Sequence, residues 1–121
     1  MDTDGTASAE GIVMPPIMGP IPYLSSSAVR DGLSQGTVLL MDVRPVRDIV
    51  KRAIIGAQPY EEGVALSDAA KGGGAKTLVL YCDQGRYRSV QVAEGLRTRG
   101  VAASVLQGGM SGWMAQGYGT G

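Results

Sequence analysis

The residues best suited to chemistry stand together around the only cysteine of the chain. The segment reads Cys82-Asp83-Gln84-Gly85-Arg86-Tyr87-Arg88-Ser89. It follows an apolar run, residues 77–81, that predicts a buried strand, and it precedes apolar residues at helical spacing. Ligands of open α/β sheets bind at such connections, beyond the carboxyl end of a strand. We therefore expect the functional site at this loop.

This loop is predicted to hold an anion beside an activated thiol. Its successive backbone N–H groups converge on a concavity, and the helix that follows adds the positive end of its dipole. Arg86 and Arg88 add two full charges. The same field favours thiolate over thiol, so we expect a lowered pKa for Cys82 and a nucleophile at neutral pH. A lone cysteine is otherwise a small buried apolar residue, but its glycine and arginine neighbours favour the nucleophile.

The composition excludes several other chemistries. The chain contains no histidine, so it cannot by itself build a Ser-His-Asp triad, a Cys-His dyad or a histidine-liganded metal site. One cysteine closes no intrachain disulfide and fits a reducing compartment, so we expect a soluble cytoplasmic protein. Eleven basic residues balance eleven acidic ones, which argues against nucleic acid or an anionic membrane as a partner. No phosphate-binding motif is present, and we expect no cofactor and no metal.

Short β-type runs alternate with helix-type stretches from Ile21 onward, which predicts one α/β domain with a mainly parallel sheet. A mass of 12.5 kDa leaves room for no second domain. We expect strands at residues 21–24, 37–43, 77–81 and 103–106. Helices are expected at residues 28–33, 47–52, 64–71, from 89 to near 100 and around Trp113, with residues 72–74 as a loop. Residues 1–19 should form a flexible lead, residues 20–118 the domain, and residues 117–121 a frayed end.

A second polar group ends the strand expected at residues 37–43. Asp42 and Arg44 should lie next to the Cys82 loop as an ion pair or loop anchor, and we assign them, with Ser89, a supporting role. Asp83 is expected to cap a turn or to offset an arginine. Tyr87 is expected at the mouth of the pocket. The predicted substrate-binding residues are Asp83, Gln84, Gly85, Arg86, Tyr87 and Arg88.

Three motifs in order resemble the rhodanese-like domain family over nearly all of residues 21–118. They are Asp42-Val43-Arg44 followed by Gly56-Ala57, Leu80-Tyr81-Cys82 followed by Gly85 and Arg88-Ser89, and Leu106-Gln107-Gly108-Gly109-Met110 followed by Trp113 and Gly117. The chain departs from the family at Ala53 and Ile55, which replace the His and Pro of a Gly-His-Ile-Pro-Gly turn. The resemblance implies a single rhodanese-like α/β domain, a small mainly parallel β-sheet flanked by α-helices.

The resemblance also implies a thiosulfate sulfurtransferase that forms a persulfide on Cys82. In such an enzyme the thiolate attacks the outer sulfur of thiosulfate or another small anionic sulfane donor, and sulfite leaves. A thiol, a protein cysteine or cyanide then accepts the sulfur. The loop N–H groups and arginines would stabilise the bound anion and the persulfide.

The length of the loop leaves other activities of this fold open. In common single-domain members the arginine follows the cysteine by five positions, whereas Arg88 follows Cys82 by six. A second alignment ends the loop at Arg86-Tyr87 and makes Arg88 the first helical residue. A Cys-x5-Arg loop also resembles rhodanese-fold phosphatases and arsenate reductases, although those carry His where this chain has Tyr81. A non-catalytic docking module is a third alternative, but such members generally lack the cysteine. Sulfur transfer is favoured.

Overall fold

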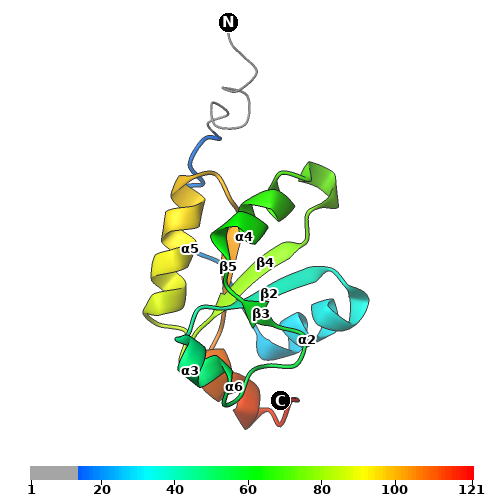
Figure 1. The fold of residues 1–121 in the computed structure, drawn as a ribbon. Helices are drawn as coiled ribbons and strands as arrows, with labels where there is room; N and C mark the ends of the chain where they lie inside the picture. The colour runs from blue at the N-terminus through cyan, green and yellow to red at the C-terminus, as the bar shows by residue number, and fades with distance from the viewer. Residues whose placement is uncertain (1–13) are drawn as a thin grey trace, which may run out of the picture.

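A five-stranded parallel sheet forms the centre of the computed structural model, which describes residues 14–121 (Figure 1). The strands are β1 (Tyr23–Leu24), β2 (Val38–Asp42), β3 (Gln58–Pro59), β4 (Thr77–Tyr81) and β5 (Ala103–Leu106). Their order in the sheet is β1-β5-β4-β2-β3, and every neighbouring pair is parallel. Asp42 and Tyr81 are register partners, so β2 and β4 end side by side. The segments that follow them therefore meet at one edge of the sheet.

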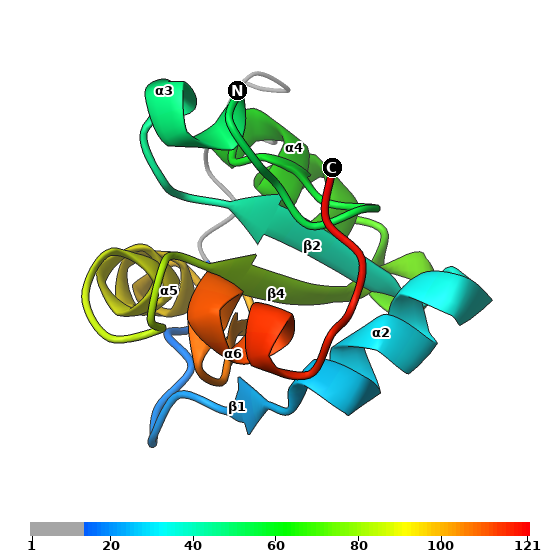
Figure 2. The same ribbon diagram turned by 90° about the horizontal axis from the view of Figure 1, so that it is seen from below.

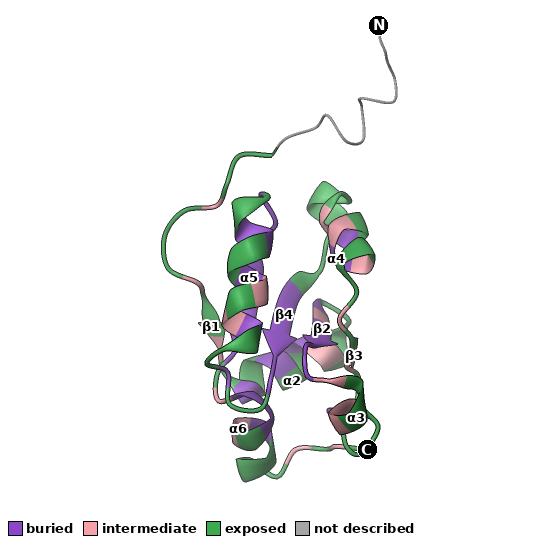
Figure 3. Ribbon diagram, turned by 60° about the vertical axis from the view of Figure 1, so that its left-hand side comes forward, coloured by how far each residue is buried: buried purple, intermediate pink, exposed green. Residues whose placement is uncertain are grey.

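Helices cover both faces of this sheet, and Figure 2 shows α5 and α2 on opposite sides of the strands. They are α2 (Ser26–Gln35), α3 (Val46–Ile49), α4 (Glu62–Ala69), α5 (Arg88–Thr98) and α6 (Gly109–Ala115), with a 3₁₀ turn, η1, at Gly72–Gly74. Alternate residues of β4 enter two cores, because successive side chains of a strand point to opposite faces. Leu78 and Leu80 pack in the core that includes residues of α4 and α5, and Val79 and Tyr81 in the core that includes residues of α2 and α6. Figure 3 shows β4 buried over most of its length.

The predicted single α/β domain with a parallel sheet is confirmed, down to the ends of several elements. The strands predicted at residues 77–81 and 103–106 coincide with β4 and β5. Helix α2 begins after Ser25, whose hydroxyl accepts a hydrogen bond from the Ala28 N–H at 3.2 Å. It ends at Gly36, which is left-handed with a φ of 74°. No helix within residues 14–121 has the length and apolar character needed to cross a membrane.

The carboxyl-terminal residues are ordered, so the prediction that residues 117–121 fray is wrong. The Ala53 N–H donates to the Gly121 carbonyl at 2.9 Å, and the Gly121 N–H donates back to the Ala53 carbonyl at 2.8 Å. The Trp113 indole N–H donates to the Gly119 carbonyl at 3.0 Å. Backbone groups of the segment before β3 thus hold the end of the chain. The side chains of residues 117–121 give no sign of this pairing, because only backbone groups form it.

The residues that lead into β1 lie against α5. The Ile17 N–H donates to the Arg97 carbonyl at 2.8 Å, and the Arg97 guanidinium donates to the carbonyls of Met18 and Pro20. Of the predicted flexible lead, residues 1–13 lie outside the described residues. The domain boundary at residue 20 stays a prediction.

Candidate active site

Cys82 stands at the carboxyl end of β4, and the Cys82 loop, residues 82–88, turns from this strand into α5. Gly85 allows the turn, because its φ of 72° lies in the left-handed region. A Cβ atom on Gly85 would also stand 2.8 Å from the Leu106 carbonyl oxygen. The loop is therefore packed tightly against the end of β5.

N–H groups at the start of α6 donate hydrogen bonds to the backbone of the Cys82 loop. The Met110 N–H donates to the Cys82 carbonyl, and the Ser111 N–H donates to the Asp83 carbonyl, both at 2.9 Å. Gly109 is left-handed with a φ of 56°, and a Cβ atom there would overlap the Cys82 carbonyl oxygen. The turn at Gly108-Gly109 thus packs directly against the backbone of Cys82 and Asp83 and fixes the position of Cys82 at the sheet edge.

The Cys82 sulfur lies among hydrogen-bond donors. Burial by itself raises the pKa of the Cys82 thiol, since the residue is only 8% exposed. The Ser89 hydroxyl, 3.1 Å from the sulfur, and the backbone N–H groups of Ser89, Gly85 and Arg86 act in the opposite direction. Together they outweigh burial and lower the pKa, as the sequence led us to expect. The thiolate therefore forms at lower pH than it does in a free cysteine.

The pH profile of Cys82 alkylation should report this environment. The native protein should react with iodoacetamide along a curve whose midpoint lies at lower pH than in the urea-unfolded protein, because unfolding removes the donors that lower the pKa. Ser89→Ala should move the native midpoint upward, since it removes the strongest of these donors. The unfolded chain is a matched reference because Cys82 is its only cysteine. Coincident native and unfolded curves would contradict the described environment.

A pocket of about 410 Å³ opens over the Cys82 loop. Tyr87 stands at its mouth, 77% exposed, as predicted. Gly85 is buried below it and contributes its N–H to the sulfur. The pocket is lined by Arg44, Pro45, Asp48, Cys82, Asp83, Gln84, Arg86, Tyr87 and Arg88. The structure thus brings the predicted substrate-binding side chains to one cavity.

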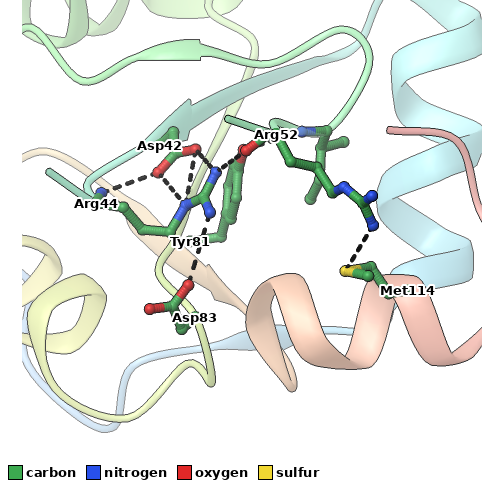
Figure 4. Close-up of polar contacts among 7 residues, drawn as sticks. Asp42, Arg44, Arg52, Tyr81, Asp83 and Met114 are labelled. Carbon is green, nitrogen blue, oxygen red and sulfur yellow. Dashed lines mark hydrogen bonds and ion pairs between the residues drawn. The ribbon is translucent and has the colours of Figure 1, made fainter. Parts of the chain in front are cut away.

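Asp42 and Arg44 form a buried ion pair beside this pocket, as expected (Figure 4). The Arg44 guanidinium donates to both carboxylate oxygens of Asp42 at 2.7–3.1 Å, and its backbone N–H donates to the same carboxylate at 2.9 Å. It also donates to the Arg52 carbonyl and lies over the Tyr81 ring, 5.6 Å from the ring centroid. Hydrogen bonding to Asp42 raises the pKa of Arg44, so this cation is permanent.

The outer edge of the same guanidinium reaches the Cys82 loop. One Arg44 nitrogen lies 3.6 Å from the Asp83 carboxylate, so Asp83 offsets an arginine as predicted. Asp42 itself is 2% exposed and does not line the pocket. The pair therefore links the end of β2 to the loop, and its supporting role in the chemistry stays a prediction.

Two features of the site were not predicted, and a third decides between the two alignments of the loop. Ser89 was assigned a supporting role, yet its hydroxyl contacts the sulfur directly. Asp48 of α3 lines the pocket, and its place shortly after Arg44 is the only sequence signal for it. Helix α5 begins at Arg88, which is the helix start of the second alignment. Within residues 14–121, no three His, Cys, Asp or Glu side chains gather in a way that could hold a metal ion.

The site and the fold together define the class of protein. A parallel α/β sheet with a cysteine loop between a central strand and a helix matches the rhodanese-like domain, whose family model covers residues 25–116. The chain belongs to the rhodanese-like domain family. No curated protein sequence matches it significantly.

Solved structures with the same fold belong to proteins that are described as having different activities. A protein from Anabaena shares 26% identity over 81% of this chain and 79% of its own, with a TM-score of 0.65. A thiosulfate sulfurtransferase from Pseudomonas aeruginosa shares 24% identity over 84% of this chain but only 19% of its own, with a TM-score of 0.66. A protein from Rhodopseudomonas palustris, described as a possible tyrosine phosphatase, shares 22% identity over 82% of this chain and 83% of its own, with a TM-score of 0.65. These likenesses show only the fold. The activity of this chain therefore has to be inferred from the residues of its site.

Proposed function

We propose that this chain is a sulfurtransferase that carries sulfur as a persulfide on Cys82. The observation that supports the proposal best is the setting of the sulfur, which has the Ser89 hydroxyl at 3.1 Å and three backbone N–H groups that help to lower its pKa. Arg86 and Arg88 line the pocket above. A thiolate beside converging donors and two cations suits a reaction in which both the substrate and the intermediate are anions.

The first half-reaction takes sulfur from a small anion such as thiosulfate. The Cys82 thiolate attacks the outer sulfur of the donor and forms a new sulfur–sulfur bond. The sulfur–sulfur bond of thiosulfate breaks, its electron pair leaves with sulfite, and Cys82 keeps a persulfide anion. The N–H groups of Gly85, Arg86 and Ser89 are placed to stabilise negative charge on sulfur. The arginines would hold the donor anion.

The second half-reaction returns the enzyme to the thiolate. A nucleophile, either cyanide or a thiolate, attacks the outer sulfur of the persulfide. The bond between the two sulfurs breaks, and its electron pair returns to Cys82. The pocket of about 410 Å³ leaves room for either kind of acceptor.

Intact mass measurement tests the first half-reaction. The reduced protein should gain the mass of one sulfur atom on incubation with thiosulfate, and cyanide should remove it. Cys82→Ser is the matched control and should gain nothing, because no other cysteine can carry the sulfur. An unchanged mass of the native protein would overturn the proposal.

Phosphate-ester hydrolysis or arsenate reduction is the second candidate. Five residues separate Cys82 from Arg88, and α5 begins at Arg88, so a loop of this length could surround a tetrahedral anion. Asp48 lines the same pocket as Cys82 and could protonate a leaving group. Hydrolysis of p-nitrophenyl phosphate that is lost in Cys82→Ser would support the phosphatase. Turnover of neither thiosulfate, the phosphate ester nor arsenate would favour a docking module.

A further inference from the structure

The depression that holds Cys82 continues beyond the Cys82 loop. A second pocket of about 310 Å³ adjoins the first and shares Arg44, Asp48 and Asp83 with it. The second pocket reaches from residues of α3 and the turn after it to residues of α6. Its further lining residues are Lys51, Arg52, Met110, Ser111 and Met114. Figure 4 shows the Arg52 guanidinium pointing toward the Met114 sulfur of α6.

The two pockets together offer more space than thiosulfate or cyanide needs. Pockets that enclose whole organic ligands have volumes of about 300–1,000 Å³, and each of the two pockets already reaches that range. Thiosulfate or cyanide at Cys82 would leave the part near Met114 empty. The extension is therefore suited to a larger acceptor that brings its nucleophile to Cys82.

The charge around the joined pockets selects the kind of acceptor. Five cationic side chains line them, against the carboxylates of Asp48 and Asp83. One of the five, Arg44, is already neutralised by Asp42. The remaining cations are Lys51, Arg52, Arg86 and Arg88. This excess of positive charge stands out in a chain whose net charge is zero, and it complements an acidic partner.

Two exposed apolar side chains belong to the same depression. Tyr87 lines the first pocket and is 77% exposed, and Met114 lines the second pocket and is 43% exposed. Apolar groups within a charged depression are typical of surfaces that bind another protein.

We propose that the acceptor of the Cys82 sulfur is a cysteine of an acidic protein that docks over α3, Tyr87 and the second pocket. The inference rests on the proposed sulfur transfer. The thiolate of the partner attacks the outer sulfur of the Cys82 persulfide, and the sulfur–sulfur bond of this persulfide breaks. The electron pair returns to Cys82, and the partner leaves with the persulfide. No further oxidant or reductant is consumed.

Two synthetic peptides test the charge preference. Each carries one central cysteine, flanked by glutamates in the first peptide and by lysines in the second. With thiosulfate as donor, kcat/KM for transfer to the acidic peptide should exceed that for the basic peptide by about tenfold or more at low salt. The preference should shrink as salt is added, because exposed charges are screened. Equal values for the two peptides would overturn the inference.

Two variants and two matched controls locate the docking surface. Lys51→Glu and Met114→Glu should each reduce the preference for the acidic peptide several-fold, because they place negative charge on the proposed surface. Lys76→Glu and Met18→Glu make the same changes at positions that line neither pocket, and they should leave the preference unchanged. A preference that Lys51→Glu and Met114→Glu do not alter would overturn the docking site.

The two proposals fail in different ways. If thiosulfate adds no sulfur to Cys82, the proposed function is wrong and the acceptor inference falls with it. If the persulfide forms and cyanide removes it, but neither peptide is preferred, the proposed function stands and only the acidic acceptor is wrong.

Discussion

Replacing Asp42 with alanine is expected to lower the free energy of unfolding by about 3–5 kcal/mol, because it leaves a buried guanidinium without its counter-ion. The side chains of Arg44 and Asp42 are only 6% and 1% exposed. Both carboxylate oxygens of Asp42 accept hydrogen bonds from Arg44, so the substitution removes all of them at once. Urea unfolding followed by circular dichroism measures the loss. In the Asp42→Ala protein that remains folded, Cys82 should also react more slowly with iodoacetamide. Arg44 links β2 to the Cys82 loop through Asp83, and the substitution disturbs this link.

Two further variants separate this cost from a general effect of losing charge. Glu62→Ala removes the exposed ion pair with Arg99 and should cost less than about 1 kcal/mol. The double variant Asp42→Leu with Arg44→Met should recover much of the loss, because a buried ion pair can be exchanged for apolar residues at small cost. A loss in Asp42→Ala no greater than that in Glu62→Ala would show that the buried pair does not hold the site together.

The sheet could be predicted from the sequence because its inner strands are buried on both faces. Residues 78–81 are a continuous apolar run and residues 103–106 are apolar except for Ser104, as expected for parallel strands that are covered by helices. The carboxyl ends of such strands fall on one edge, so Cys82 and Arg44 could be placed together before any coordinates were known. Turn chemistry added the ends of α2, where Ser25 and Gly36 act as caps.

The elements that were missed depend on partners distant in the sequence. β3 has two residues, one of them Pro59, and it exists because Met41 and Asp42 offer backbone groups beside it. The pairing of the chain end with Ala53 uses backbone groups alone, so the glycine-rich residues 117–121 gave no pattern for it. Local propensity cannot reveal an interaction of this kind.

The chemistry of the site was predictable to the level of the loop but not of each side chain. Residue types and spacing indicated a thiolate beside donors and cations. Ser89 contacts the sulfur because of the direction in which α5 points its side chain. This direction depends on where the helix begins, which is at Arg88. The second pocket depends on how α3 and α6 meet across the sheet edge, and no local pattern encodes that crossing.

Gly109→Ala is expected to slow persulfide formation on Cys82 by about 100-fold, because displacement of a reacting group by about 1 Å has an effect of that order. The new Cβ atom would overlap the Cys82 carbonyl oxygen and stand 2.8 Å from the Asp83 carbonyl group. To relieve this overlap, the loop must rise from the start of α6 and lose hydrogen bonds from Met110 and Ser111. The rate of sulfite release from thiosulfate, with enzyme in excess, measures the effect.

Gly36→Ala separates the overlap from backbone strain. Gly36 also has a left-handed φ, 74°, but a Cβ atom there would have nothing within 4 Å. Both variants bear the strain of a left-handed alanine, about 1–2 kcal/mol, and only Gly109→Ala pushes against the backbone of Cys82. Gly36→Ala should therefore lose stability and keep its rate of sulfite release. If both variants lose stability equally and both keep that rate, the position of Cys82 does not depend on the Gly108-Gly109 turn. A selective loss of rate in Gly109→Ala would mean that a glycine in contact only with the backbone of the Cys82 loop determines the position of the Cys82 sulfur.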